Sequence, residues 1–340
     1  MSLSSAEGHA ARFAERRDDG RVRCGLCPHR CVIQEGEVGR CGVRGVRGGE
    51  LRALTYGIFA SMALDPIEKK PLYHFHPGRD ILSIGGWGCN FSCKYCQNYE
   101  ISQNVLGGRT LTPDDLLRAA KREPANLGVA FTYNEPLIWY EFLHDSARLL
   151  KDADMRVVLV TNGYIEPQPL EELLPLVDAA NVDLKSLDDT FYRELCGGRL
   201  DPVLEALRRF GAECHLEVTK LLVTGHTDPV DDAVAVAQWL SQEVGRHVPL
   251  HLSRYFPQHQ WQSPETPMEV LDAAHEGASE HLDFVYIGNA RRPKASDTHC
   301  PGCGETVIER SALGARITGL TDADACASCH TPIAIVRSPE

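Results

Sequence analysis

Three cysteines, Cys89, Cys93 and Cys96, are separated by only three and two residues. Thiolates are strong ligands for zinc and for iron–sulfur clusters, and a closed site of either kind normally has four ligands. Three thiolates leave one coordination position open. A catalytic zinc would hold water there, whereas a four-iron cluster would leave one iron able to bind an exogenous molecule. The spacing therefore predicts a metal centre with an open position and leaves both metals possible.

A second group of cysteines lies near the start of the chain, within the stretch CGLCPHRCVIQEGEVGRCGVR. Its spacings of two, three and nine residues match neither a simple zinc ribbon nor the ferredoxin run. Zinc and an auxiliary iron–sulfur cluster are both compatible with it. We favour a structural metal over an electron relay, because a segment this short buries little core by itself. The four residues are Cys24, Cys27, Cys31 and Cys41.

A third group ends the chain as two Cys-x-x-Cys pairs with 22 residues between them, Cys300 with Cys303 and Cys326 with Cys329. This arrangement is typical of a tetrahedral structural zinc site. Rubredoxin-type iron has the same ligands, so iron remains an alternative. Of thirteen cysteines, two stand outside the three groups, Cys196 and Cys214, and we interpret both as small buried apolar residues.

The composition is that of a globular enzyme, with 43% hydrophobic and 24% charged residues among 340. No run is apolar enough for a membrane span, and the start of the chain lacks the apolar stretch of a signal peptide. We therefore expect a cytoplasmic protein in which clustered thiols bind metal. A net charge of −12 with no long basic face argues against binding nucleic acid.

Short apolar runs alternate with amphipathic, helix-like stretches through the middle of the chain. One such stretch starts with the N-cap residue Thr112 and Pro113. Repeated strand–helix units predict a parallel sheet, and the polar motifs follow the strands, where a β/α barrel builds its active site. A doubly wound sheet is the alternative. The expected strands lie at 81–86, 127–133, 156–163, 179–186, 215–223, 248–255 and 284–289.

The stretch CNFSCKYC resembles the Cys-x3-Cys-x2-Cys signature of the radical SAM superfamily, including the aromatic residue before the third cysteine, here Tyr95. The resemblance implies a [4Fe-4S] cluster on the three cysteines and S-adenosylmethionine on the open iron. In that family the reduced cluster cleaves the cofactor to a 5'-deoxyadenosyl radical, which abstracts hydrogen from a substrate. It also implies that Tyr95 lies beside the adenine, and that the fold is α/β, a partial (β/α)6-type TIM barrel.

The TYNEP stretch resembles the Gly-Gly-Glu-Pro element of this family, with Tyr133 and Asn134 in place of the two glycines. The resemblance makes Glu135 the acceptor for the methionine ammonium group. An acid that stabilises the start of a helix is the alternative interpretation of Glu135.

Three later strand ends resemble the activating enzymes of glycyl-radical enzymes. They supply Asn162 from VTNGY, Asp183 and Lys185 from DLKS, and His251 from LHLSRYFP. The resemblance implies that these side chains contact the cofactor, with the lysine paired to its carboxylate. The alternatives are an ion pair between Asp183 and Lys185 and a core histidine at His251.

The N-terminal cysteine pattern, with FTYNEP, HLSRYFP and the tail CPGCG, is similar to the radical SAM enzymes of the AmmeMemoRadiSam system. That likeness implies Memo-like and AMMECR-like partner proteins and a low-potential electron donor of the flavodoxin or ferredoxin type. The substrate is a small molecule or, in an enzyme related to the activase of pyruvate formate-lyase, a partner protein. A zinc-binding scaffold is the alternative of another class.

These patterns predict three parts of the chain. We expect an N-terminal cysteine-rich module at 1–75, the barrel at 76–292, and a C-terminal four-cysteine module of zinc-ribbon or rubredoxin type at 293–340.

Overall fold

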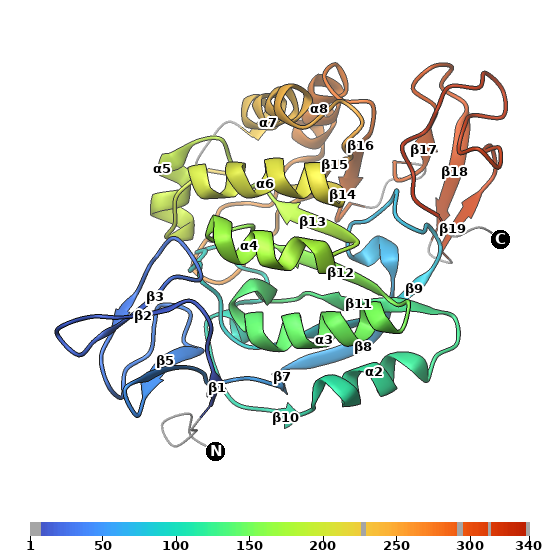
Figure 1. The fold of residues 1–340 in the computed structure, drawn as a ribbon. Helices are drawn as coiled ribbons and strands as arrows, with labels where there is room; N and C mark the ends of the chain where they lie inside the picture. Colours follow the sequence, from blue (N-terminus) through green and yellow to red (C-terminus); the bar gives the residue numbers. More distant parts are fainter. Residues whose placement is uncertain (1–7, 226–228, 291–294, 312–313, 338–340) are drawn as a thin grey trace.

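The computed structural model describes residues 8–225, 229–290, 295–311 and 314–337. Its centre is an eight-stranded sheet in which seven strands run parallel and β8, at one edge, runs antiparallel to β9 (Figure 1). All seven expected strands are present, and the α/β fold class is confirmed. In spatial order the strands are β16 (Val285–Gly288), β15 (Leu250–Arg254), β14 (His215–Leu222), β13 (Ala179–Asp183), β12 (Arg156–Thr161), β11 (Asn126–Phe131), β9 (Asp80–Gly85) and β8 (Ser61–Pro66).

Helices follow the strands in chain order and cover one face of the sheet (Figure 1). The helix expected after Thr112 is α2, which begins at Pro113 and has a capping box formed by Thr112 and Asp115. The helices are α1 (Tyr99–Ser102), α2 (Pro113–Lys121), α3 (Tyr140–Asp152), α4 (Pro167–Leu173), α5 (Asp189–Phe191), α6 (Asp201–Glu213), α7 (Pro229–Glu243) and α8 (Met268–Ser279).

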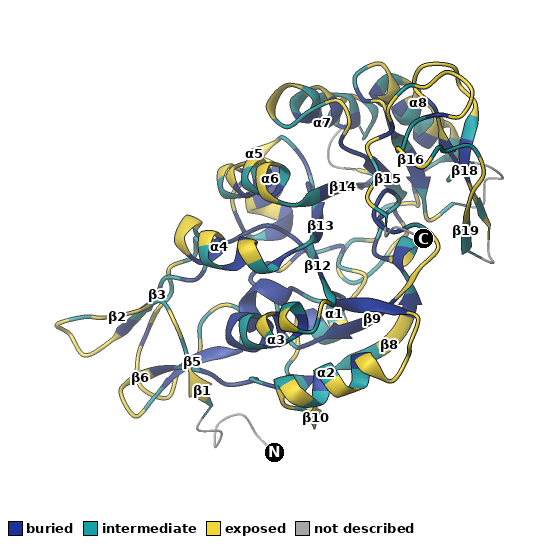
Figure 2. Cartoon of the chain, turned by 45° about the vertical axis from the view of Figure 1, so that its right-hand side comes forward, coloured by how far each residue is buried: buried dark blue, intermediate teal, exposed yellow. Residues whose placement is uncertain are grey.

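The other face of the sheet is covered by residues 67–76, which we call the inner segment. Its side chains Ile67, Leu72 and Phe75 are buried in one cluster with residues of β9, β11, β12 and β13. Glu217 on β14 accepts hydrogen bonds from the backbone N–H groups of Tyr73 and His74, at 2.9 and 2.7 Å. The central strands are therefore buried on both faces, as continuous apolar runs require (Figure 2).

The C-terminal residues pack against the inner segment. Their three short strands form an antiparallel sheet, and beyond it the backbone N–H of Val336 donates to the carbonyl of His74 at 2.8 Å. The His74 ring is fully buried between the Ala334 carbonyl and the Tyr286 hydroxyl, each 2.6 Å away. The strands are β17 (Thr298–His299), β18 (Thr306–Ser311) and β19 (Gly314–Ile317).

The N-terminal residues form two small antiparallel sheets beside α3 and α4 (Figure 1). One has the order β1 (His9–Ala10), β6 (Glu50–Ala53), β5 (Arg44–Arg47), and the other β2 (Ala14–Arg16), β3 (Val22–Cys24), β4 (Val32–Ile33). A further pair joins β7 (Ile58–Phe59) to β10 (Arg109–Thr110).

The expected boundary at residue 75 falls after β8, so the edge strand of the large sheet comes from the residues assigned to the N-terminal module. The second expected boundary, between residues 292 and 293, lies outside the described residues. None of the described helices is both long enough and apolar enough to cross a membrane.

We predict that Glu141→Ala strongly destabilises the protein. Glu141 of α3 accepts two hydrogen bonds from the Arg44 guanidinium, at 2.9 and 2.7 Å, and both side chains are 2% exposed. Removing one partner leaves a buried charge, which costs about 3–5 kcal/mol of the free energy of unfolding. Chemical denaturation measures the change. The matched control Glu15→Ala breaks an exposed pair with Arg23 and should cost at most ~1 kcal/mol; equal losses in the two variants would contradict the prediction.

Candidate active site

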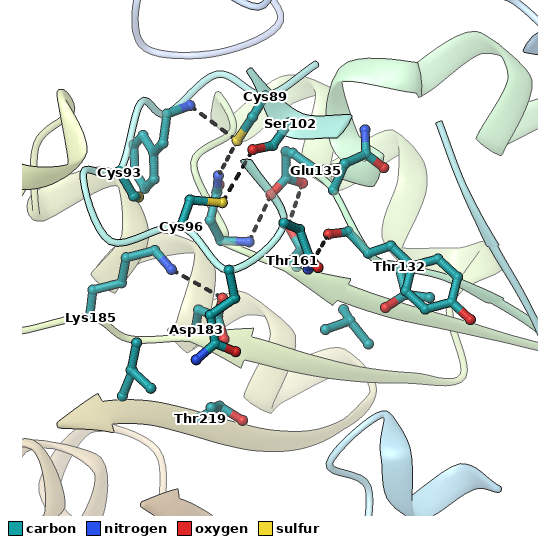
Figure 3. A pocket seen from close by; sticks show the side chains of 18 of the residues that line it. Cys89, Cys93, Cys96, Ser102, Thr132, Glu135, Thr161, Asp183, Lys185 and Thr219 are labelled. Carbon is teal, nitrogen blue, oxygen red and sulfur yellow. Dashed lines mark hydrogen bonds and ion pairs between the residues drawn. The ribbon is translucent and has the colours of Figure 1, made fainter. Parts of the chain in front are cut away.

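A pocket of about 350 Å3 opens at the carboxyl ends of the parallel strands. Side chains from the loop after β9 and from the ends of β11, β12, β13 and β14 point into it (Figure 3). The pocket brings together ten of the residues expected to bind the cluster or the cofactor: Cys89, Cys93, Tyr95, Cys96, Tyr133, Asn134, Glu135, Asn162, Asp183 and Lys185.

The three cysteines, which we call the triad, are free thiols on a loop without regular secondary structure, residues 86–98, which we call the triad loop. The Cys89 sulfur accepts a hydrogen bond from the backbone N–H of Phe91 at 3.3 Å, and the Cys96 sulfur lies 3.2 Å from the Ser102 hydroxyl. Burial raises the pKa of the Cys89 and Cys96 thiols, so a nearby positive charge is needed to hold them as thiolates. Three free thiols facing one pocket fit an iron–sulfur cluster with one open position.

Glu135 is fully buried at the end of β11 and faces the pocket. Its carboxylate accepts hydrogen bonds from the Thr161 hydroxyl at 2.6 Å, the Asn162 backbone at 2.8 Å and the Leu137 backbone at 3.0 Å. The last bond also caps the short helix Pro136–Trp139, so the alternative role expected for this acid is present as well. Burial raises the pKa of Glu135 to about 7, although these hydrogen bonds oppose the rise.

Asp183 and Lys185 at the end of β13 form an ion pair, with 3.1 Å between the Lys185 ammonium and the Asp183 carboxylate. Burial by itself would lower the pKa of Lys185, but the neighbouring Asp183 charge outweighs it and raises the pKa well above the usual value. The ion pair expected as the alternative is therefore formed. Both side chains still line the pocket, where they can also meet a zwitterionic ligand.

Tyr133 has a left-handed backbone with φ of 72°, a conformation that is costly for an aromatic residue. Its side chain is held by a 2.7 Å hydrogen bond to Asp65, and its carbonyl accepts from the Asn98 amide at 2.7 Å. The next residue, Asn134, accepts from the Gly86 backbone and donates to the Gly88 carbonyl. These bonds explain how residues other than glycine can occupy this strand end.

His251 is not among the residues that line the pocket. It lies on β15 two residues before Ser253, which lines the pocket. Successive residues on the same face of a strand are about 7 Å apart, so His251 lies one layer below the pocket. The His251 ring nitrogen Nε2 is 2.7 Å from Glu217, and the ring stacks on Tyr286. Burial alone would raise the pKa of Glu217, yet hydrogen bonds from His215 and His251 hold it well below its usual range.

Cys196, which the sequence suggested was a simple apolar residue, contacts the predicted cluster site. Its sulfur is 3.3 Å from the Tyr95 hydroxyl and hydrogen-bonds to the Cys93 thiol. Its backbone carbonyl also accepts from the Ser92 N–H at 2.8 Å. No motif marks this residue, because it reaches the triad from a separate helical turn, Tyr192–Cys196.

The four C-terminal cysteines form a compact group with all four sulfurs within 4.8 Å of one another. The sulfurs of Cys300 and Cys329 are 3.5 Å apart, and those of Cys303 and Cys326 are 3.7 Å apart. Thiolates bound to a single tetrahedral metal at ~2.3 Å would be about 3.8 Å apart, so the group fits one metal ion.

The fold and the site together define a partial β/α-barrel protein with a three-cysteine pocket at its strand ends. The family model described as "Radical SAM superfamily" matches residues 84–240 of this chain. An uncharacterized protein of Methanocaldococcus jannaschii is 41% identical over 335 residues, covering 96% of this chain and 99% of that protein. The chain belongs to the radical SAM superfamily. Membership implies an enzyme that uses a [4Fe-4S] cluster and S-adenosylmethionine.

Two further relatives are activating enzymes. The pyruvate formate-lyase-activating enzyme of Clostridium pasteurianum is 32% identical over 134 residues, which cover 37% of this chain and 56% of that enzyme. The pyruvate formate-lyase 1-activating enzyme of Escherichia coli K12 is 26% identical, covering 51% of this chain and 74% of the relative. The chain thus spans about half of the first of these and three quarters of the second, and its homology to activating enzymes is established.

Solved structures share the fold. Streptococcus suis SuiB bound to S-adenosylmethionine superimposes with a TM-score of 0.50 and 14% identity, over 62% of this chain and 52% of that one. A radical SAM methyltransferase from Sphaerobacter thermophilus gives 0.50 and 18% identity, over 64% and 68%.

We predict that Cys303→Ala removes about one equivalent of metal per chain, since a tetrahedral site that loses one of four thiolates binds its ion much more weakly. Elemental analysis of the purified protein measures the loss and identifies the metal as zinc or iron. Cys214→Ala is the matched control, because Cys214 belongs to none of the three cysteine groups. Unchanged metal content in Cys303→Ala would contradict a metal role for this group.

Proposed function

We propose that Cys89, Cys93 and Cys96 hold a [4Fe-4S] cluster and that the enzyme acts on a substrate in the pocket beside it. The observation that carries the proposal is the convergence of three free thiols, a buried carboxylate and a lysine–aspartate pair on one cavity at the strand ends. When bound, the cluster and S-adenosylmethionine supply a 5'-deoxyadenosyl radical that abstracts hydrogen from the substrate.

Glu135 is the residue best suited to bind the cofactor's ammonium group. Its carboxylate is held rigidly by three donors, so it needs no reorganisation when the ligand arrives. A buried carboxylate gains strongly from a cation at hydrogen-bond distance, because the cation offsets the cost of removing its charge from water.

Lys185 and Asp183 suit the remaining polar groups of the cofactor. Lys185 can bind a carboxylate while Asp183 accepts from an ammonium or a ribose hydroxyl. Tyr95, 3% exposed, offers a flat ring beside the triad for the adenine. Tyr133, Asn134 and Asn162 complete the wall, and Asn162 also links to the triad loop through Asn90 at 2.9 Å. His251 lies on β15 two residues before the pocket-lining Ser253, so we propose that it supports this site from below.

A small molecule is the substrate class we favour. The pocket of about 350 Å3 has the size of a small-molecule site, and the cluster, the cofactor and the substrate would share it. The part of the pocket wall formed by Lys70 and Tyr133 is polar. The Lys70 ammonium donates to Asp65 at 2.9 Å and lies over the ring of Tyr133. The second candidate is an activating enzyme that places a radical on a partner protein, which the homology to activating enzymes favours.

The protein's setting is also part of the proposal. We infer an AmmeMemoRadiSam-type system with Memo-like and AMMECR-like partners, a flavodoxin or ferredoxin as the low-potential electron donor, a cytoplasmic location, and zinc in the C-terminal group. The N-terminal cysteine pattern and the C-terminal four-cysteine group support it.

The central test is anaerobic reconstitution followed by reduction with S-adenosylmethionine present. We expect 5'-deoxyadenosine to form, and Cys93→Ala to lose the iron of the triad together with this product. Cys214→Ala, a cysteine outside the pocket, should retain both. Wild-type protein with an intact four-iron cluster and no 5'-deoxyadenosine would refute the proposal. A colourless all-zinc protein would support the scaffold alternative instead.

We further predict that S-adenosylmethionine binds more weakly as the pH falls. Because the pKa of Glu135 is raised to about 7, the carboxylate takes up a proton below that pH and no longer attracts an ammonium group. The dissociation constant should then rise by up to about tenfold per pH unit. Equilibrium binding between about pH 6 and about pH 8.5 measures it. Glu135→Gln should bind weakly and lose this dependence; an unchanged pH profile in that variant would exclude Glu135 as the cause.

A further inference from the structure

A serine hydroxyl lies beside one of the triad sulfurs. Ser102, the last residue of α1, lines the pocket, and its oxygen is 3.2 Å from the Cys96 sulfur (Figure 3). Ser102 is 5% exposed, so little water competes for this contact. The reduction potential of an iron–sulfur cluster depends on the hydrogen bonds to its sulfurs, since a donor stabilises the negative charge that the cluster gains on reduction. The contact therefore bears on how easily a cluster on the triad is reduced.

The direction of this hydrogen bond is set by a neighbouring amide. Gln103 donates through Nε2 to the Phe91 carbonyl at 3.1 Å and to the Ser102 oxygen at 3.3 Å. The Phe91 carbonyl can only accept, which identifies the nitrogen side of the Gln103 amide at both contacts. The Ser102 oxygen thus accepts from Gln103, and its own proton is left for another partner. A metal-bound Cys96 thiolate carries no proton and can only accept, so Ser102 is the donor to Cys96.

The short helix that carries Ser102 is fastened to the triad loop at both of its ends. The Gly88 N–H of the loop donates to the Ile101 carbonyl at 2.8 Å, and the Ser102 N–H donates to the Asn98 carbonyl at 3.0 Å. The hydroxyl is therefore held beside Cys96 by the backbone of the loop itself. A donor that is already in place needs no reorganisation when negative charge develops on the sulfur.

The side chain at position 102 is not explained by the fold of α1. Alanine would suit a buried helix position better than serine, because it has the higher helix propensity and buries no polar group. The Cys89 sulfur has a different kind of donor, the backbone N–H of Phe91 at 3.3 Å, which a change of side chain does not remove. At Cys96 the donor is a side chain, so the sequence can adjust the potential of the cluster through this residue.

We propose that Ser102 is a positioning residue that raises the reduction potential of the triad cluster by donating a hydrogen bond to Cys96, and that Gln103 fixes the direction of this bond. Because this role requires a cluster on Cys89, Cys93 and Cys96, it rests on the proposed function. Ser102 then determines how strong an electron donor the enzyme needs, without taking part in the chemistry of the substrate.

The test measures the reduction potential of the cluster in anaerobically reconstituted full-length protein, by a redox titration that follows the electron paramagnetic resonance signal of the reduced cluster. Ser102→Ala should keep the iron of the triad and lower the potential. The ratio of reduced to oxidised cluster at a fixed potential should fall about three- to tenfold, which is ~30–60 mV for one electron. Ser102→Thr retains a hydroxyl and should restore most of the potential. Ser146→Ala removes a buried hydroxyl of α3 outside the pocket and is the matched control, which should leave the potential unchanged.

A second measurement follows the hydrogen itself. In D2O, pulsed electron paramagnetic resonance should detect a deuteron coupled to the reduced cluster that is missing from Ser102→Ala. Gln103→Leu removes the amide that orients the hydroxyl and should lower the potential by a smaller amount.

An intact cluster with the wild-type potential in Ser102→Ala would overturn the role of Ser102 and leave the proposed function standing. A fall of equal size in Ser102→Thr would also overturn it, since the shift would then come from packing and not from the hydroxyl. If Ser102→Ala assembles no cluster, Gln103→Leu decides, and an unchanged potential in that variant would be the contradicting result. Wild-type protein that assembles no four-iron cluster would overturn both this role and the proposed function.

Discussion

The rest of the site depends on how the backbone of the triad loop is satisfied. This loop is partly buried and has no regular secondary structure, so its buried N–H and carbonyl groups need partners elsewhere. Ser92 and Lys94 donate to the carbonyls of Cys196 and Leu195, and the Lys94 carbonyl accepts from Gln260. Asn134 and Asn162 join the loop to the ends of β11 and β12. The positions of the thiols thus follow from contacts made by four distant parts of the chain.

Below the site, the barrel interior is filled by a charged and aromatic network. The Glu217 carboxylate accepts hydrogen bonds from the backbone of the inner segment and from the ring of His251. Its low pKa keeps it ionised for these bonds. Two residues further along the same strand, Thr219 lines the pocket. The strands therefore carry a structural layer and a chemical layer at successive same-face positions, as expected in a barrel.

Much of this arrangement could be predicted from the sequence. Apolar runs gave the seven parallel strands, and because parallel strands end at one edge, Glu135, Asp183 and Lys185 were expected to meet. The position of a residue along its strand, level with the pocket or below it, was harder to predict. Nothing in LHLSRYFP distinguishes Ser253, which lines the pocket, from His251, which lies below it. The contact of Cys196 with Tyr95 was not predicted, because it depends on how the helical turn Tyr192–Cys196 packs against the triad loop. The clustering of the N-terminal cysteines was visible in the sequence, and the structure places all four around one small pocket.

The pairing of the last described residues with the inner segment has a consequence for biosynthesis. His74 and Ala334 lie 260 positions apart in the chain and are held together at 2.6 Å. While the ribosome is still making the C-terminal residues, the inner segment has the strands of the sheet on one side and no partner on the other. The interior of the barrel is therefore completed only after residues 334–336 have been made, and a chain cut before them would have every pocket residue and an unsupported floor beneath.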